Sequence, residues 1–184
     1  MKKVFGILAL TMALLVATNV CAQDKSIGVY FDTAGTQNGK TSTAEWGHPA
    51  PAPFDAYVIA FAEMVVGGAA FKLEMNPAIN FIGATFPAGI QIGEIRNGIE
   101  IGLTNPVVGY FGYPVRLATV SIWPGWTPFS DALMCIVPWA PNYPDVTLSD
   151  HQGVLYPAEG RCAHFSVVVP GDETSWGSVK SLYQ

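Results

Sequence analysis

The residues able to do nucleophilic or acid–base chemistry are few and scattered along the chain. The three histidines are His48, His151 and His164, and no pair of them has metal-ligand spacing. The sequence holds no Gly-x-Ser-x-Gly turn or comparable nucleophile motif. We therefore expect these histidines to be ordinary surface or strand residues, and the sequence assigns no catalytic residue and no transition-metal site.

Carboxylates offer the one enzymatic alternative, a small secreted hydrolase that uses an acidic pair. Such an enzyme needs two carboxylates about 5–10 Å apart, one of them desolvated. The acidic candidates are Asp32, Glu45, Glu63, Glu74, Glu94 and Glu100. Glu74 alternates with Leu73 and Met75, which favours a solvated sheet face over a catalytic cleft.

Oxygen donors gather in the second half of the chain, where a calcium ion is the alternative to having no cofactor. The donors are Asp131, Asn142, Asp145 and Asp150. Carboxylate and amide oxygens suit Ca²⁺, but the spacing matches neither an EF-hand nor a calcium-binding repeat. We therefore expect no bound cofactor.

A dense group of aromatic residues is the one feature that favours a binding function. It comprises Trp123, Trp126, Phe129, Trp139, Tyr143 and Tyr156, interleaved with prolines. Aromatic side chains on stiff loops form flat platforms for sugar rings or protein side chains. The alternative is that they cover one open end of the fold. We take Trp123, Trp126, Trp139 and Tyr143 as the candidate ligand platform.

The first 22 residues have the features of a cleavable secretory signal. Lys2 and Lys3 precede an apolar run over 5–17, which is shorter than the roughly 20 residues that span a membrane. We expect cleavage after Ala22, with one domain over residues 23–184, and a lipidated Cys21 as the alternative. The protein is then periplasmic or secreted, and no later segment reads as a transmembrane span.

Two cysteines remain after cleavage, Cys135 and Cys162. An isolated pair in an exported domain predicts one disulfide bond. Loss of Lys2 and Lys3 takes the formal charge from −5 to −7, and the remaining basic residues are scattered. This charge excludes nucleic acid as a favoured partner. A carbohydrate or a protein stays open.

Strand-like alternation predicts the fold class. Runs with a period of two predict strands at 27–32, 54–64, 71–75, 79–85, 90–92, 99–103, 114–123, 133–137 and 163–169. Asn97-Gly98 between two such runs predicts a hairpin. Residues 35–53 and most of 123–156 are expected as loops because of their prolines and polar residues. About nine short strands predict an all-β, antiparallel two-sheet sandwich, either immunoglobulin-like or cohesin-like.

Three segments resemble cohesin domains. They are 68–85 with its Asn-Pro turn, 98–104, and the Leu-Ala-Thr-Val strand within 115–122. The resemblance spans about 56–122 and implies a two-sheet sandwich, without implying that dockerin binding carries over. The opening at 27–36 and the end at 174–183 also resemble uncharacterised secreted bacterial proteins, which implies export and nothing chemical.

The sequence therefore predicts an exported, non-enzymatic β-sandwich module that binds a glycan, a surface polymer or a protein. Contact is expected at the aromatic residues between Trp123 and Tyr143. Phe71, Leu73, Met75, Ile99, Ile101 and Leu103 are expected to form one side of the core.

Overall fold

The computed structural model describes residues 25–43, 52–109, 113–125 and 129–168, and every regular element in these ranges is a strand. In chain order they are β1 (Ser26–Tyr30), β2 (Gly39–Thr43), β3 (Phe54–Phe61), β4 (Val65–Met75), β5 (Asn80–Thr85), β6 (Gly89–Glu94), β7 (Gly98–Val108), β8 (Val115–Trp123), β9 (Phe129–Val137), β10 (Val146–Asp150), β11 (Leu155–Gly160) and β12 (Cys162–Val168). The all-β class is confirmed. The expected strand count of about nine was too low, because twelve strands lie in the described ranges.

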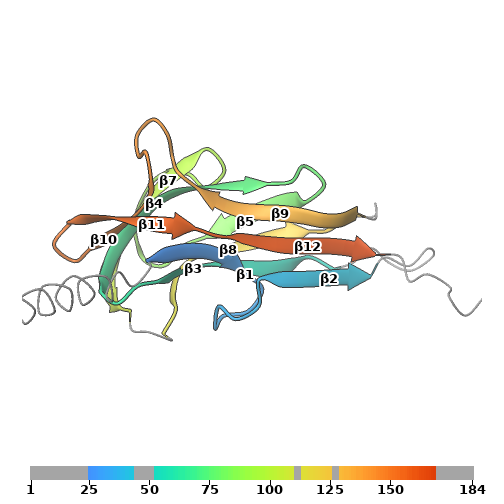
Figure 1. Ribbon diagram of the computed structural model, residues 1–184, viewed down its shortest axis with the longest axis horizontal. Coiled ribbons are helices and arrows are strands. Elements are labelled where there is room, and N and C mark those ends of the chain that lie inside the picture. The colour runs from blue at the N-terminus through green and yellow to red at the C-terminus, as the bar shows by residue number, and fades with distance from the viewer. Residues whose placement is uncertain (1–24, 44–51, 110–112, 126–128, 169–184) are drawn as a thin grey trace, which may run out of the picture.

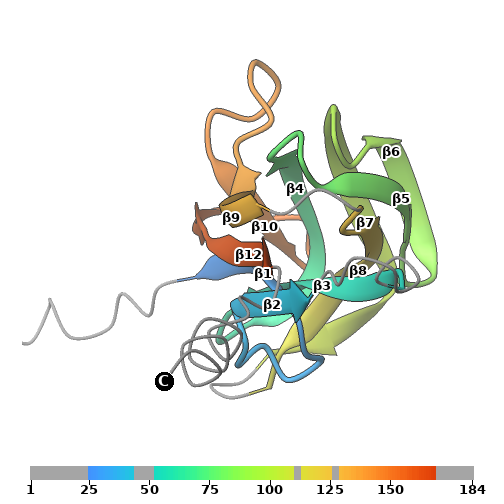
Figure 2. The same cartoon turned by 90° about the vertical axis from the view of Figure 1, so that its right-hand side faces the viewer.

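The strands form one continuous hydrogen-bonded path that folds over itself into a sandwich. Its order is β2-β12-β9-β4-β10-β11-β1-β3-β8-β5, and β7 and β6 branch from β4. Figures 1 and 2 show the path from two sides, with most strands running along the long axis of the molecule. The long strand β4 has different partners along its length. Residues 65–71 pair with β7 and β10, whereas residues 72–75 pair with β9.

Two of the pairings are parallel, which corrects the expectation of a wholly antiparallel sandwich. β1 pairs with β11, and β2 pairs with β12, in the same direction. Both pairs join a strand from the start of the described chain to one near its end. Strands so distant in sequence need no hairpin between them, so a turn does not impose the antiparallel direction.

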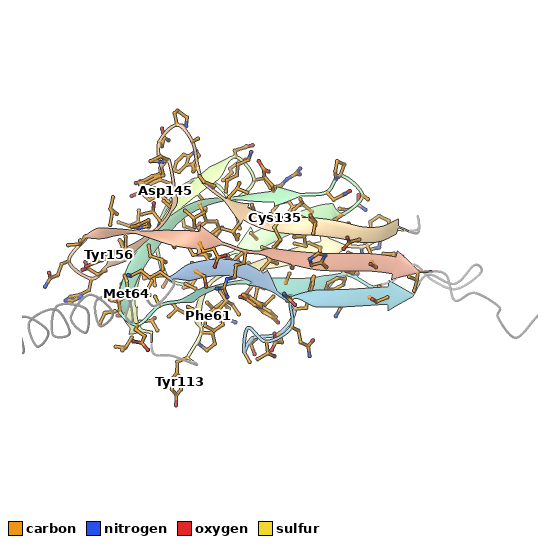
Figure 3. All side chains as sticks on the ribbon, viewed as in Figure 1. Phe61, Met64, Tyr113, Cys135, Asp145 and Tyr156 are labelled. Atoms are coloured by element: carbon orange, nitrogen blue, oxygen red, sulfur yellow. A yellow bond between two sulfur atoms is a disulfide. The ribbon has the colours of Figure 1, made fainter. Side chains whose placement is uncertain are left out.

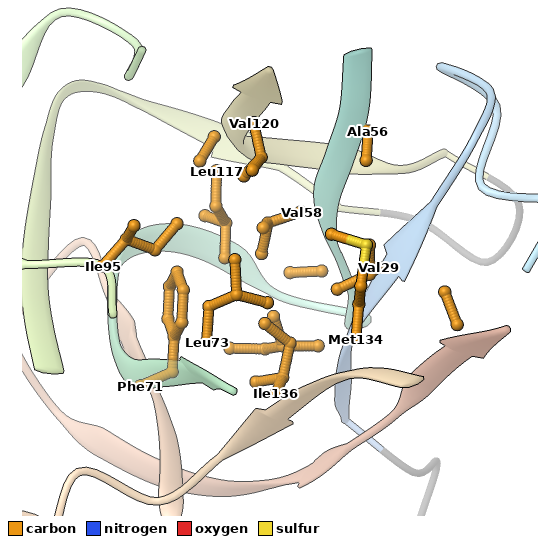
Figure 4. Packing of buried hydrophobic residues seen from close by; sticks show 14 of the residues in the cluster. Val29, Ala56, Val58, Phe71, Leu73, Ile95, Leu117, Val120, Met134 and Ile136 are labelled. Atoms are coloured by element: carbon orange, nitrogen blue, oxygen red, sulfur yellow. The ribbon is translucent and has the colours of Figure 1, made fainter. Parts of the chain in front are cut away.

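The core lies between the two layers (Figure 4). Phe71 and Leu73 of β4 are buried there with Ile99 and Ile101 of β7, as their alternation predicted. Figure 4 shows Phe71, Leu73, Met134 and Ile136 across from Val58, Leu117 and Val120 of β3 and β8. The other two predicted core residues, Met75 and Leu103, are half-buried and pack against this cluster.

Three strands, β2, β10 and β11, were not among those predicted, and β2 and β10 lie wholly where loops were expected. β2 occupies part of 35–53, and its polar sequence Gly-Lys-Thr-Ser-Thr carries no apolar alternation that could reveal it. Its backbone pairs with β12 over five residues, and the Lys40 ammonium lies 4.4 Å from the centre of the Phe54 ring. This strand owes its place to tertiary pairing, which overrides local propensity.

The second unexpected strand is β10, inside the proline-rich stretch 123–156. Val146 and Leu148 are buried, and β10 is a central strand between β4 and β11. The prolines that argued against a strand lie before it, at positions up to 144, where they do not interrupt its hydrogen bonds. The high proline content of the stretch as a whole therefore concealed the short strand β10.

The predicted disulfide is confirmed. Cys135 of β9 and Cys162 of β12 lie directly opposite each other in the sheet, with Cα atoms 4.0 Å apart (Figure 3). The bond closes a loop with a sequence separation of 27 residues. Chain-entropy arguments give such a bond a contribution of about 3–4 kcal/mol to stability.

In the ranges that the structure describes, no helix is long and apolar enough to cross a membrane. The predicted signal over residues 1–22 lies outside the described residues, so its cleavage after Ala22 stays a prediction.

Candidate functional site

The outer face of β6, β7, β4, β10 and β11 carries a groove, and the strand register shows how it is built. Residues directly opposite each other on neighbouring strands point to the same face of a sheet. One row across the strands is therefore Ile90, Gly102, Gly68, Ser149 and Leu155. The adjacent row is Ile92, Glu100, Ala70, Thr147 and Pro157. In both rows the middle positions hold small side chains, apart from Glu100.

The floor of the groove is low because its central residues have little or no side chain. Gly68 is held so closely that a Cβ atom there would lie 2.3 Å from the carbonyl oxygen of Ile101. Gly102, its partner across the strands, is different, since a Cβ atom there would meet only Ile90, at 4.0 Å. The resulting depression has a volume of about 260 Å³. Glycine at 68 satisfies packing, whereas glycine at 102 keeps the floor open.

Large apolar side chains stand at the two rims of this floor. Ile90 and Ile92 of β6 are 70% and 56% exposed, and Leu155 of β11 is 57% exposed. Single exposed apolar residues are common on protein surfaces, but apolar residues that line one depression together are typical of an interaction site. Each comes from the end position of its row, which places small residues between them.

Tyr143 and Glu100 supply a polar contact at the groove. Burial raises the pKa of the Tyr143 phenol, and its hydrogen bond to the Glu100 carboxylate raises the pKa further. The phenol is therefore protonated at neutral pH and donates to Glu100. The Thr147 hydroxyl donates to the carbonyl oxygen of Asp145 at 2.9 Å. Glu100 is the charged residue among the described residues that line the groove.

Part of the predicted aromatic platform borders this groove. The Trp139 and Tyr143 rings lie 5.9 Å apart with their planes at 31°, in the loop between β9 and β10. The backbone N–H of Tyr143 donates to the carbonyl oxygen of Trp139 at 2.8 Å. The Trp139 indole also covers Gly98, where a Cβ atom would come within 1.9 Å of the ring. Trp139 is therefore seated against the β6–β7 turn and is half-buried.

The structure does not gather the rest of that platform at the same place. Trp123 is half-buried at the end of β8, where its carbonyl oxygen accepts a hydrogen bond from Asn80 of β5 at 3.2 Å. β8 pairs with β3 and β5, whereas β9 and β10, on either side of the loop that holds Trp139, pair with β4. Trp126 lies outside the described residues. The four-residue platform stays a prediction, of which Trp139 and Tyr143 form a contacting pair.

Four of the acidic candidates for hydrolysis contact a polar partner, namely Asp32, Glu74, Glu94 and Glu100. Glu74 forms an ion pair with Lys72 at 2.8 Å, and Glu94 accepts a hydrogen bond from Asn97 at 2.9 Å. Asp32 accepts hydrogen bonds from Thr36 and Gln37 in the β1–β2 loop. Burial alone would raise the pKa of Asp32, but these hydrogen bonds outweigh it and lower the pKa. Glu45 and His48 lie outside the described residues, whereas Glu63 is exposed between β3 and β4.

Two of the oxygen donors considered for calcium, Asp131 and Asp150, contact nearby groups. The Asp131 carboxylate lies 2.5 Å from Nδ1 of His164 on the exposed side of β9 and β12. Asp150 accepts hydrogen bonds from the backbone N–H groups of Gln152 and Val154 in the β10–β11 turn. In the part of the chain that the structure describes, no three His, Cys, Asp or Glu residues form a group able to hold a metal ion.

The sequence did not predict the groove, although the alternation of Ile90 and Ile92 correctly predicted a strand. That strand was expected to be half-buried, yet no residue of β6 is buried. The sequence could not show which strands pair with β4. The pairs Gly68–Gly102 and Gly68–Ser149 join segments that the sequence alone does not bring together.

Comparison with known proteins supports the fold and no specific activity. No protein-family model matches the sequence, and no curated protein matches it either. Among solved structures, a non-cellulosomal cohesin from Archaeoglobus fulgidus is similar, with a TM-score of 0.51 and 10% identity, over 84% of this chain and 97% of that chain.

Two further cohesins are similar at the same level. A module from a family 33 glycoside hydrolase of Clostridium perfringens has a TM-score of 0.51 and 11% identity, over 78% of this chain and 96% of that chain. The third ScaB cohesin of R. flavefaciens, solved in complex with a group 1 dockerin, has a TM-score of 0.50 and 11% identity, over 82% of this chain and 99% of that chain. The described chain therefore has a cohesin-like β-sandwich fold, as the three resembling segments predicted.

Proposed function

We propose that this protein is a non-enzymatic protein-binding module, and that its partner docks in the groove on β6, β7, β4, β10 and β11. The observation that carries the proposal is the arrangement of that face. Exposed Ile90, Ile92 and Leu155 flank a floor of small residues. Such a surface accepts an apolar side chain of a partner between its rims and removes the exposed apolar area from water.

The chemistry of the groove favours a protein over a sugar as the occupant. Sugar sites combine an aromatic face with several hydrogen-bonding groups; Tyr143 gives this groove one aromatic residue, but the residues that stand at its two rims, Ile90, Ile92 and Leu155, are aliphatic. The Glu100 carboxylate lies in the middle of the second row, next to Ile92. A partner that presents an apolar residue beside a lysine or arginine matches both groups, because the basic residue would pair with Glu100 as the apolar residue fills the groove.

The structural comparison is consistent with this proposal. The R. flavefaciens cohesin was solved bound to a protein, a dockerin. That partner belongs to that protein, and the low identity transfers no partner to this chain. It supports the narrower statement that a sandwich of this kind can serve as a protein-binding scaffold.

The test uses a photo-crosslinking amino acid placed at Ile90 in the producing cell. A captured partner is then purified, and its affinity is measured by calorimetry for the wild type and for Ile92→Asp. The matched control is Ile82→Asp, because Ile82 on β5 is also 56% exposed but does not line the groove, and β5 pairs with β8 and not with a groove strand.

Loss of binding in Ile92→Asp, with wild-type affinity in Ile82→Asp, supports the groove. Equal affinities in the two variants would reject it. Thermal midpoints close to that of the wild type would show that both variants are folded.

Glycan binding is the second candidate, favoured by the contact between the Trp139 and Tyr143 rings. A glycan array separates the two proposals. Binding that is lost in Trp139→Ala and kept in Ile92→Asp would support a glycan platform. We also propose that the protein acts outside the cytoplasm, which the Cys135–Cys162 disulfide supports.

A further inference from the structure

The edge strand β6 has little of the protection that proteins usually give a sheet edge, since Glu94 at its last position is its one charged residue. It pairs with β7 and with no other described strand, and all six of its residues are exposed. Its sequence, Gly-Ile-Gln-Ile-Gly-Glu, contains neither lysine nor proline. Charged residues, prolines or bulges normally block such an edge, because its free N–H and C=O groups can pair with another strand. Figure 2 shows β6 at the margin of its layer.

The sequence of this edge is a palindrome centred on Gln91. Read in either direction, residues 89–93 are Gly-Ile-Gln-Ile-Gly. Two identical strands related by a two-fold axis pair antiparallel, and each residue then faces its mirror position in the palindrome. Gln91 faces Gln91 of the second copy, and Ile90 faces Ile92. Opposed residues share a face of the sheet, so this register keeps both isoleucine pairs on the outer face.

The hydrogen bonding of β6 supports the same centre. Thr104 of β7 donates its N–H to the carbonyl oxygen of Ala88 at 3.1 Å. Because N–H and C=O groups alternate in direction along an antiparallel strand, Ile90 and Ile92 direct theirs to β7. Gly89 and Gln91 direct theirs to the open edge. Gln91 can therefore exchange two hydrogen bonds with its own copy across the axis.

The isoleucines then occupy the other kind of antiparallel pair, in which side chains are closer. In pairs without hydrogen bonds the Cα atoms are about 4.5 Å apart, compared with about 5.5 Å in bonded pairs. Ile90 of one copy would pack against Ile92 of the other, twice by symmetry. Glu94 would face Ala88, so no like charges oppose each other. A register centred on Ile92 would instead place the Glu94 carboxylate against the apolar Ile90 side chain.

We propose that β6 is a self-association site, and that its occupant is β6 of a second copy of this chain. The resulting dimer continues the sheet across the two-fold axis. It joins the four isoleucines into one apolar strip, with one groove on each side. This proposal does not depend on partner binding in the groove, and either can fail without the other.

The test follows from the position of Gln91 on the axis. Gln91→Lys places two positive charges opposite each other, and Gln91→Glu places two negative charges there. Sedimentation velocity over a range of concentrations should show a wild-type dimer and a monomer for each variant. An equimolar mixture of the two variants should restore the dimer, because each lysine then faces a glutamate.

The control is Ile82→Lys on β5, another edge strand, which should leave the dimer intact. A wild type that stays monomeric at every concentration would overturn the proposal. So would a Gln91→Lys protein that remains dimeric, a mixture that stays monomeric, or a dimer that only Ile82→Lys dissociates. Open-ended fibres would equally reject it, because two-fold pairing is closed.

Discussion

Gly68 and Gly102 form a matched pair that tests how the groove is built. They lie opposite each other on β4 and β7, in the same row of the groove floor. A Cβ atom at Gly68 would lie 2.3 Å from the Ile101 carbonyl oxygen and 2.8 Å from the Ser149 hydroxyl. A Cβ atom at Gly102 would meet only Ile90, at 4.0 Å. The same Gly→Ala substitution should therefore have opposite consequences for stability.

The expected magnitudes follow from these contacts. Replacing glycine by alanine without strain stabilises a protein by about 0.4–1 kcal/mol, because the unfolded chain loses freedom. Gly102→Ala should gain this amount. Gly68→Ala must push the β4 and β7 backbones apart, and overpacking of this kind costs about 1–3 kcal/mol. The net result for Gly68→Ala is a loss of roughly 1–2 kcal/mol.

Urea denaturation and thermal unfolding measure both changes. A change of 1 kcal/mol moves the thermal midpoint by about 2–4 °C in a protein of this size. The effect of Gly102→Ala on partner affinity is expected to be opposite to its effect on stability, because the methyl group at position 102 raises the groove floor. Gly102→Ala should weaken partner binding while it stabilises the fold.

Two results would refute this reasoning. Equal destabilisation by Gly68→Ala and Gly102→Ala would show that the two glycines are packed alike. Stronger partner binding by Gly102→Ala would show that the depth of the floor is not what the partner uses.

Three other predictions concern stability. Leu73→Ala should lower the free energy of unfolding by about 2–5 kcal/mol because Leu73 is 1% exposed in the core. Lys72→Ala, on the other face of the strand, should lower it much less. Urea denaturation measures both changes, and similar small losses would show that Leu73 does not face the core. Reduction of Cys135–Cys162 should lower stability by about 3–4 kcal/mol, and thiol titration of the denatured, unreduced protein should find no free thiol at either position. Desolvation acts to raise the pKa of Asp150, but hydrogen bonds from the β10–β11 turn outweigh it and lower the pKa below 3.8. The contribution of the Asp150 carboxylate to the free energy of unfolding should therefore be complete above that pH and should fade as the pH falls below it. Unfolding measured as a function of pH should show this dependence in the wild type and not in Asp150→Asn.

The two proposed surfaces share the Ile90 and Ile92 side chains of β6. Self-association also uses the backbone groups at the open edge and Gln91, which partner binding does not use. Ile92→Asp should therefore weaken both, because it places a carboxylate beside Ile90 of the second copy. Gln91→Lys should affect only the dimer, since Gln91 is absent from the residues that line the groove. This difference lets the two functions be measured separately.

Local periodicity was enough to predict which residues of β4 and β7 face the core. Phe71, Leu73, Ile99 and Ile101 are buried because a period of two places alternate side chains on one face wherever a strand forms. The Asn97-Gly98 hairpin between β6 and β7 was also readable, since its turn chemistry is local. Asn97 donates its N–H to the Glu94 carbonyl oxygen at 3.0 Å, and Gly98 has a φ of 119°. The disulfide was predictable because Cys135 and Cys162 are the two cysteines that follow the expected signal segment, and two cysteines allow one pairing.

Only the tertiary structure decided which strands became neighbours, and the groove depends on that choice. Its rows join positions from five strands, and no local pattern links Gly68 of β4 to Ser149 of β10. The same holds for β2, a polar segment that became a strand by pairing with β12. The palindrome around Gln91 was present in the sequence from the start. Only the fold shows that β6 lies at an open edge of the sheet. This position is required for self-association, because a self-complementary strand can pair with its copy only where its backbone groups are free.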